Sequence, residues 1–326
     1  MENKDDLIKL FKNVAEAYKF PVGLIEKDYH LTRILHKISE RNIEDLEKPL
    51  KFPKSSKKDF ENFPESKGYS KSSINNLVFK GGTCLNKCYL DFYRLSEDLD
   101  FVYNDNLMNF TKGQIKKILD KLRRELFEIF GELGFKQSKK LGEGWKMLTS
   151  EISPRISGLE IITNYISLLD NSLQTIKIEI SFRKKLIMLT KRRVIEHKFV
   201  DSLGEQVLRK DIAIEVIDLV ENFAEKFRAL VSRKRLAVRD VFDIYFILKN
   251  SILSINNKLI NLILVKINET KKFTEKDLIE FIYNLNSRIY ELNEKELKAL
   301  IKYDEEIDIK EMIRLIIKGF EKFKTS

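Results

Sequence analysis

One segment restricts the fold of this chain more than any other. Leu77-Val78-Phe79 is a short apolar run that ends at Gly81-Gly82, and Asp98-Leu99-Asp100 later opens a run of alternating polar and apolar residues. A short apolar run before a glycine turn is typical of a buried strand, and alternation is typical of a strand with two different faces. The segment therefore predicts a strand, a glycine turn, a helix over residues 83–93 and a second strand.

The first candidates for catalysis and metal binding are Asp98 and Asp100. Residues two apart on a strand project from the same face, so the two carboxylates lie together while Leu99 points the other way. Neighbouring carboxylates repel each other unless water or a cation separates them. Mg²⁺ prefers hard oxygen ligands, commonly one or two carboxylates with phosphate oxygens. We expect two Mg²⁺ ions here, with Mn²⁺ as the substitute, and a nucleoside triphosphate as ligand.

A third carboxylate is expected on a neighbouring strand. Ile176, Ile178 and Ile180 alternate with Lys177 and Glu179, which predicts a strand with one polar face. We assign Glu179 as the third catalytic acid and metal ligand. The alternative is a surface glutamate paired with Lys177 or with an arginine just after the strand.

The residues around the glycine turn are candidates for nucleotide binding. They are Lys80, Gly81, Gly82 and Thr83. Glycines permit close approach of the backbone to a ligand, and a helix that starts here offers its first N–H groups to phosphate. We expect the Thr83 hydroxyl to cap the helix or to donate to a phosphate. Lys226, at the edge of an apolar helix face, can reach a triphosphate as a point charge.

The pattern along the chain predicts an α+β protein. Residues 159–168 and 175–182 are the best further strands, and the chain from Ala213 onward has helical periodicity nearly to its end. We expect a mixed sheet flanked by helices over residues 1–209, with N-terminal helices and a polar insertion at about 42–73. A helical bundle is expected over residues 210–326.

Composition adds information about partners. The chain has 60 basic and 50 acidic residues, a net charge of +10, which favours contact with nucleotides or nucleic acid. No apolar run is long enough to span a bilayer, and the polar N-terminus lacks the features of a signal peptide. We therefore expect a cytoplasmic protein with no membrane partner. Cys84 and Cys88 lack further ligands at zinc spacing, so they are expected to be packing residues.

Three segments, in order, resemble one family. Ile25-Glu26-Lys27-Asp28-Tyr29 is similar to the N-terminal helix of the AbiEii/AbiGii toxin family of nucleotidyltransferases, within the polymerase-β-like superfamily. The family's first motif resembles Lys80-Gly81-Gly82-Thr83 with Arg94-Leu95-Ser96-Glu97-Asp98-Leu99-Asp100-Phe101. Its C-terminal motifs resemble Glu225-Lys226-Phe227-Arg228-Ala229-Leu230, then Arg233, then Arg239-Asp240-Val241-Phe242-Asp243-Ile244-Tyr245.

This resemblance implies a nucleotidyltransferase-fold domain followed by a helical domain. It also implies a toxin of a type IV toxin–antitoxin or abortive-infection (phage-defence) module, with a cognate antitoxin encoded alongside. The implied activity is transfer of a nucleotide from a nucleoside triphosphate to an acceptor, often tRNA in related toxins. The resemblance favours nucleotide-binding roles for Lys226 and Asp240. Arg239 and Asp243 stay open between a role in the site and an intrahelical ion pair.

Two other functions are compatible with parts of the pattern. A non-catalytic protein that binds nucleotide or nucleic acid has no need for paired carboxylates beside phosphate, and a metal-dependent nuclease does not explain the glycine turn before the acids. For an RNA acceptor, the candidate basic clusters are Lys54 with Lys57 and Lys58, residues 191–193, and residues 233–235. The segment at Glu26, Lys27 and Asp28 is expected to be a solvated charge cluster or a network that docks two parts of the protein.

Overall fold

A seven-stranded mixed sheet organises the described part of the computed structural model, which comprises residues 3–47, 72–105, 110–138, 140, 142–149, 156–182 and 186–323. The strand order is β3-β4-β5-β2-β1-β7-β6. The strands are β1 (Leu77–Lys80), β2 (Asp98–Tyr103), β3 (Trp145–Thr149), β4 (Ile156–Ile166), β5 (Leu173–Ser181), β6 (Lys191–Val194) and β7 (Ala213–Val216). In the sheet β2 is antiparallel to β1 and parallel to β5, so the segment that carries the acids is a central strand.

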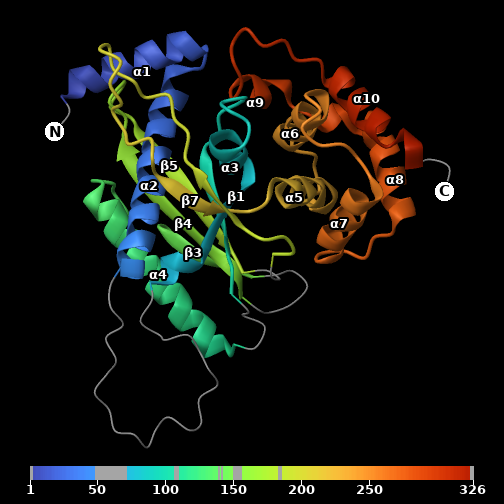
Figure 1. The fold of residues 1–326 in the computed structure, drawn as a ribbon, viewed down its shortest axis with the longest axis horizontal. Helices are drawn as coiled ribbons and strands as arrows, with labels where there is room; N and C mark the ends of the chain where they lie inside the picture. The colour runs from blue at the N-terminus through green and yellow to red at the C-terminus, as the bar shows by residue number, and fades with distance from the viewer. Residues whose placement is uncertain are drawn as a thin grey trace, which may run out of the picture.

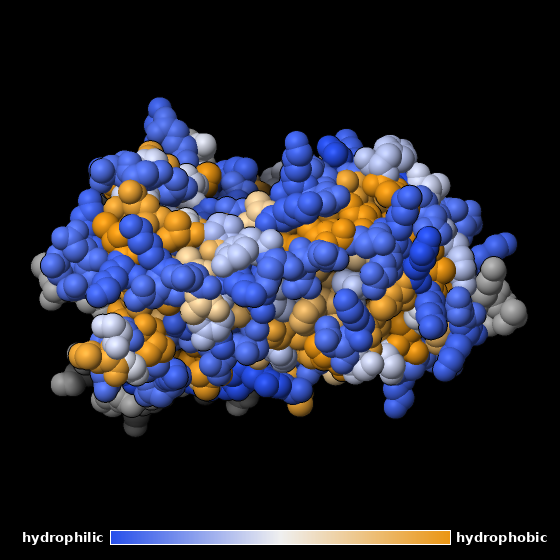
Figure 2. Space-filling model, turned by 90° about the horizontal axis from the view of Figure 1, so that it is seen from above, coloured by the Kyte–Doolittle hydropathy of each residue, from blue (hydrophilic) through white to orange (hydrophobic). Residues whose placement is uncertain are grey.

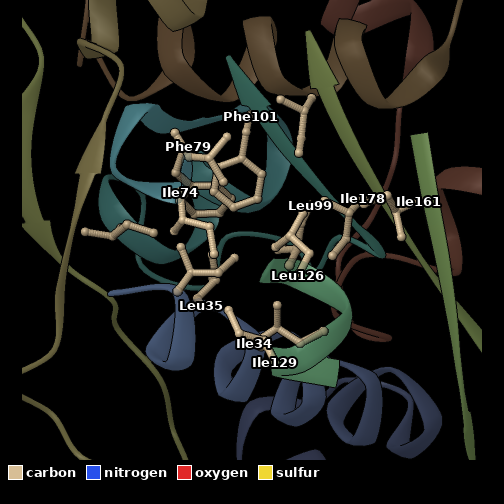
Figure 3. Packing of buried hydrophobic residues seen from close by; sticks show 14 of the residues in the cluster. Ile34, Leu35, Ile74, Phe79, Leu99, Phe101, Leu126, Ile129, Ile161 and Ile178 are labelled. Carbon is tan, nitrogen blue, oxygen red and sulfur yellow. The ribbon is translucent and has the colours of Figure 1, made fainter. Parts of the chain in front are cut away.

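The two faces of β2 differ as the alternation predicts. Leu99 lies opposite Ile178, and Phe101 lies opposite Phe79 and Ile180 in the register of the neighbouring strands. All of these side chains are fully buried and belong to one hydrophobic core, which α2 and α4 complete from the other side (Figure 3). Asp98 and Asp100 therefore project from the opposite face of the sheet.

The N-terminal part of the chain forms the helices α1 (Lys4–Tyr18), α2 (Val22–Glu47), the 3₁₀ turn η1 (Ser73–Asn76), α3 (Gly81–Cys88) and α4 (Lys112–Glu132). Of these, α2 and α4 pack on the apolar face of the sheet, whereas α1 packs against α2 in a separate apolar cluster. The α4 helix begins with a capping box, in which the Thr111 hydroxyl accepts from the Gln114 N–H and the Gln114 side chain accepts from the Thr111 N–H. Figure 1 shows α2 and α4 on one side of the sheet and the C-terminal helices on the other.

The C-terminal helices pack around a second hydrophobic core. They are α5 (Leu219–Ser232), α6 (Val238–Lys249), α7 (Asn257–Asn268), α8 (Glu275–Tyr283), η3 (Asn284–Glu291), α9 (Glu294–Lys298), α10 (Ile309–Gly319) and η4 (Glu321–Phe323). Together with the sheet, this arrangement confirms the expected fold class of a nucleotidyltransferase-like mixed sheet followed by helices.

Some expected boundaries differ from the structure, among them that of the helix expected over residues 83–93, which is α3 and ends at Cys88. The chain at Ala213 is not yet helical: Ile214 and Val216 are buried and alternate with partly exposed neighbours in strand β7, which extends the sheet past residue 209. Helix α5 starts only after Asp218, whose side chain accepts from the Val220 N–H at 2.8 Å.

The helix α2 continues to Glu47 inside the segment expected to be a polar insertion. Most of that insertion, with Lys54, Lys57 and Lys58, lies outside the described residues.

The charged segment of α2 is a docking network, and the solvated alternative is wrong. Glu26 is 1% exposed and accepts from the Ser167 hydroxyl at 2.7 Å and the Leu168 N–H at 2.6 Å. Asp28, equally buried, pairs with the Lys87 ammonium at 2.9 Å. These contacts fix α2 against α3 and against the turn between β4 and β5.

The surface agrees with the composition of the chain. Hydrophilic side chains cover most of the face seen in Figure 2, with apolar patches between them. Within the described residues, no helix has the length and apolar character needed to cross a membrane. Cys84 and Cys88 are free and buried on α3, as expected for packing residues.

Candidate active site

The acids of β2 line a cleft of about 310 Å³ between the sheet and helices α5 and α6. Its wall includes residues from β1, α3, β2, β5, α5 and α6, most of them charged. The residues that line the cleft include Lys80, Gly81, Gly82, Arg94, Asp98, Asp100, Lys177, Glu179, Asn222, Glu225, Lys226, Arg228, Arg233, Arg239 and Asp240. Every residue that the sequence assigned to the site lines this cleft except Thr83.

The register of the sheet brings the three candidate acids together. Asp100 on β2 lies opposite Lys80 on β1 and opposite Glu179 on β5, so these three residues form one row across the strands. Asp98 lies opposite Lys177, whose ammonium is 3.6 Å from the Asp98 carboxylate. The lysine that could have paired with Glu179 thus pairs with Asp98, and Glu179 is left facing the cleft.

Asp98 lies in surroundings that disfavour its charge. Burial raises the pKa of the Asp98 carboxyl above its ordinary value, and the neighbouring Asp100 carboxylate adds to the shift, whereas Lys177 and Arg239 oppose it. A cation bound here would stabilise the charged form. No group of three His, Cys, Asp or Glu side chains among the described residues is arranged to hold a metal ion. Asp98 and Asp100 do match the other way in which Mg²⁺ binds, through two carboxylates completed by phosphate oxygens.

The glycine turn needs both of its glycines. Gly81 has a φ of +79°, and a Cβ on it would lie 2.4 Å from Oδ2 of Asp100. A Cβ on Gly82 would lie 2.5 Å from Nη2 of Arg94. Asn222 on α5 brackets the turn, because its Oδ1 accepts from the Gly81 N–H at 3.2 Å and its Nδ2 donates to the Gly81 carbonyl at 3.3 Å. The backbone at the start of α3 is therefore held against the acids.

The structure assigns Thr83 a different role from the expected one. Its side chain is 1% exposed, and its hydroxyl donates to the backbone carbonyl of Asp98. A hydroxyl carries a single proton, so this hydrogen bond leaves none for a phosphate. Thr83 links α3 to β2 and holds the strand of acids in place.

Lys226 lies in the cleft, but its charge is shared. The ammonium is 3.1 Å from Asp240 and 2.8 Å from Asp243. Asp240 also pairs with Arg233. Lys226 and Asp240 therefore both reach the cleft as expected, within an ion-pair network that already compensates much of their charge.

Asp243 is the anchor of this network. It is fully buried, accepts from Nε and Nη2 of Arg94 at 2.5 and 2.8 Å, and accepts from the Tyr93 hydroxyl at 2.6 Å. Burial alone would raise the pKa of Asp243, but Arg94 and Lys226 hold it well below its ordinary value. The intrahelical pair with Arg239 does not form. Asp243 instead ties the segment before β2 to helix α6.

The sequence analysis assigned no role in the site to three residues that line the cleft: Arg94, Lys177 and Asn222. A signal existed for two of them. Lys177 is in phase with Glu179 on a strand, and Asn222 is four residues before Lys226 on one helix face. Arg94 lies outside helices and strands, where no periodicity reveals its direction.

Comparison with known proteins identifies the family. The profile of the family described as nucleotidyl transferase AbiEii toxin, Type IV TA system, matches residues 71–322. The chain belongs to this family. It is thus a nucleotidyltransferase of a type IV toxin–antitoxin family, as the resemblance implied, and the family implies a nucleotide substrate and a cognate antitoxin.

Solved structures with a similar chain path include two Helicobacter pylori proteins. JHP933 is 20% identical, with a TM-score of 0.41, over 76% of this chain and 86% of its own. A proposed nucleotidyltransferase from H. pylori is 20% identical, with a TM-score of 0.37, over 77% of this chain and 90% of its own. No curated protein sequence matches the chain.

Proposed function

We propose that this AbiEii-family enzyme transfers a nucleotide from a nucleoside triphosphate to tRNA in a metal-dependent reaction at the described cleft. One observation carries the proposal: Asp98 and Asp100 project into the same cleft that the Gly81-Gly82 turn enters at the start of α3. Paired carboxylates suit Mg²⁺, and a helix N-terminus suits phosphate. Their adjacency suits a magnesium-bound triphosphate.

The reaction proposed is attack of an acceptor hydroxyl on the α-phosphorus with release of pyrophosphate. Asp98 and Asp100 would hold Mg²⁺, or Mn²⁺ in its place, with phosphate oxygens of the nucleotide as the further ligands. The metal, when bound, neutralises charge on the reacting phosphates. Gly82, at the start of α3, brings its backbone N–H to the triphosphate, while the Gly81 N–H is held by Asn222. Glu179, in register with Asp100, takes the proton of the attacking hydroxyl.

In such a reaction the protein itself positions the reactants and compensates the charge of the phosphates. Asn222 fixes the turn, the Arg94 guanidinium packs closely against Gly82, and Thr83 fixes the strand of acids. Lys226 and Asp240 complete the wall of the cleft opposite the sheet. A nuclease would use the same acids, yet the close fit between Gly81 and Asp100 favours a site built to hold a triphosphate against the carboxylates.

The acceptor is proposed to be RNA because two clusters of basic side chains are exposed outside the cleft or at its wall. All of β6, with Lys191, Arg192 and Arg193, is exposed at the edge of the sheet. The second cluster, residues 233–235, is also exposed, and its member Arg233 lines the cleft. The setting proposed is the cytoplasm, where tRNA and triphosphates occur, and a role in phage defence rests on the family resemblance.

A labelling experiment separates the candidate functions. The purified protein is incubated with each labelled nucleoside triphosphate, MgCl₂ and total tRNA. Labelled tRNA of full length supports transfer, shortened RNA indicates a nuclease, and unchanged RNA with bound nucleotide indicates a binding protein. Asp98→Ala is the control that should remove the label.

The acceptor is tested by charge reversal. Lys191→Glu with Arg192→Glu, and separately Lys234→Glu with Arg235→Glu, should reduce tRNA labelling and spare binding of the free nucleotide. Binding of tRNA should weaken steeply with salt, since phosphate contacts release counterions. Labelling that is unaffected by both pairs, with no salt dependence, would point to a protein hydroxyl as the acceptor.

A further inference from the structure

Most of the cations that line the cleft are already held by carboxylates. The pairs are Arg94 with Asp243, Lys226 with Asp240 and Asp243, Arg228 with Glu225, and Arg233 with Asp240. A cation committed to a carboxylate has less attraction left for a ligand. Lys226, the cation that the sequence analysis assigned to the triphosphate, is paired with two carboxylates.

Arg239 differs from these cations. It lies on the first turn of α6, lines the cleft and is partly buried. Within the described part of the chain it makes no hydrogen bond and no ion pair. Asp98 and its partner Lys177, both from the sheet, line the same cleft as Arg239.

We propose that Arg239 is a triphosphate-binding residue, whose guanidinium binds phosphate oxygens of the nucleotide in the cleft that Asp98 and Asp100 line. The inference rests on the proposed function and adds to it the residue that recognises the polyphosphate. A guanidinium offers a planar fork of donors that matches phosphate oxygens in pairs. A partly buried guanidinium without a protein acceptor is favourable only when water or an anion satisfies these donors.

The position of Arg239 favours the triphosphate over an RNA backbone. The exposed basic clusters on β6 and after α5 can reach a large acceptor, whereas Arg239 lies in the wall of a cleft of about 310 Å³. Asp98 is also the carboxylate where the nucleotide's own magnesium is expected. A polyphosphate that shares a metal with Asp98 would bring its oxygens into the cleft that Arg239 also lines.

The test is direct binding of phosphate compounds to the full-length protein, measured by calorimetry with MgCl₂. The probes are inorganic tripolyphosphate, the four ribonucleoside triphosphates and AMP, and the variants are Arg239→Ala, Arg239→Gln and Arg239→Lys. The matched control is Arg124→Ala, an exposed arginine on α4 whose Nε donates to the Asp120 carbonyl. Loss of a charge-assisted hydrogen bond should weaken tripolyphosphate binding by about tenfold or more in the Ala and Gln variants. The Lys variant should be intermediate, and the control and AMP binding should not change.

The outcomes separate this inference from the proposed function. If the wild-type protein binds no triphosphate, the proposed function fails, and the inference fails with it. If the wild type binds and the folded Ala and Gln variants bind as tightly, the inference is overturned while the proposed function stands. Weaker binding of tRNA with unchanged binding of tripolyphosphate would also overturn it, since the phosphate would then belong to the acceptor.

Discussion

Sequence motifs single out Asp98 and Asp100 on β2 and Asp243 on α6, yet these acids lie in opposite surroundings. Asp98 and Asp100 face a cleft, and the ion pair of Asp98 with Lys177 is long, at 3.6 Å. Asp243 is fully buried and receives hydrogen bonds from Tyr93 and Arg94 and an ion pair from Lys226. A carboxylate whose charge the protein leaves uncompensated is available to a ligand, whereas one that the protein saturates holds the structure together.

The largest expected effect is on activity at β2. Asp98→Ala and Asp100→Ala should each lower nucleotide transfer by on the order of 10³-fold, because metal coordination contributes several kcal/mol to such reactions. Turnover with saturating MgCl₂ measures this. Without metal, each variant should melt at or above the temperature of the wild type, since removing one acid relieves repulsion. Near wild-type turnover in either variant would remove that acid from the site.

The next largest effect is on stability at α6. Asp243→Asn should lower the free energy of unfolding by about 3–5 kcal/mol, because it leaves the buried Arg94 guanidinium without its carboxylate and Lys226 with Asp240 alone. Urea unfolding at neutral pH measures the difference.

The pH dependence of that difference follows from the lowered pKa of Asp243. A carboxyl with a folded pKa below its unfolded value of about 3.9 stabilises the protein above that pH and loses the effect as pH falls. The gap between wild type and Asp243→Asn should thus be full at pH 7 and shrink below about pH 4. A variant of wild-type stability that has lost only nucleotide binding would instead place Asp243 with the acids of β2.

Substitution of Gly81 should have a smaller effect, which lowers both activity and stability. Gly81→Ala forces a side chain into a left-handed conformation, at a cost of about 1–2 kcal/mol, and pushes it against Asp100. Activity should therefore fall further than this loss of stability explains. Gly131→Ala on α4, where a Cβ meets no atom within 4 Å, is the matched control. Equal activity in the two variants would show that the turn does not position Asp100.

Patterns local in the chain predicted the sheet face of the site well. Alternation around Asp98, Asp100 and Glu179 is a property of each strand, and the structure confirms the strands and places these residues in one cleft. Their assignment as metal ligands stays a prediction. Contacts between distant segments were beyond the sequence, because no local period reveals which partner a buried charge meets. Arg94 with Asp243 joins residues 149 positions apart, and the spacing on α6 had suggested Arg239 in place of Arg94.

The boundary of the helical part shows the same limit. Three of the four residues 213–216 are apolar, which is compatible with either period over so short a run, and pairing with β1 and β6 decides for a strand. Thr83 shows the same limit of sequence analysis. A threonine at the start of a helix can cap the helix, bind a phosphate or hydrogen-bond to another strand. Only the position of the Asp98 carbonyl in the structure shows that Thr83 does the last of these.

The smallest expected effect is that of substituting Thr83, and it tests whether this residue binds the ligand or holds the structure together. Thr83→Val keeps the shape of the side chain and removes the hydrogen bond to Asp98. If the hydroxyl only holds β2, the free energy of unfolding should fall by about 1 kcal/mol, and the affinity for triphosphate should stay unchanged. Thr83→Ser keeps the hydroxyl and should recover most of the stability. Weaker triphosphate binding in Thr83→Val at unchanged stability, restored by serine, would return Thr83 to the ligand-binding residues and show that the hydroxyl turns toward phosphate when nucleotide binds.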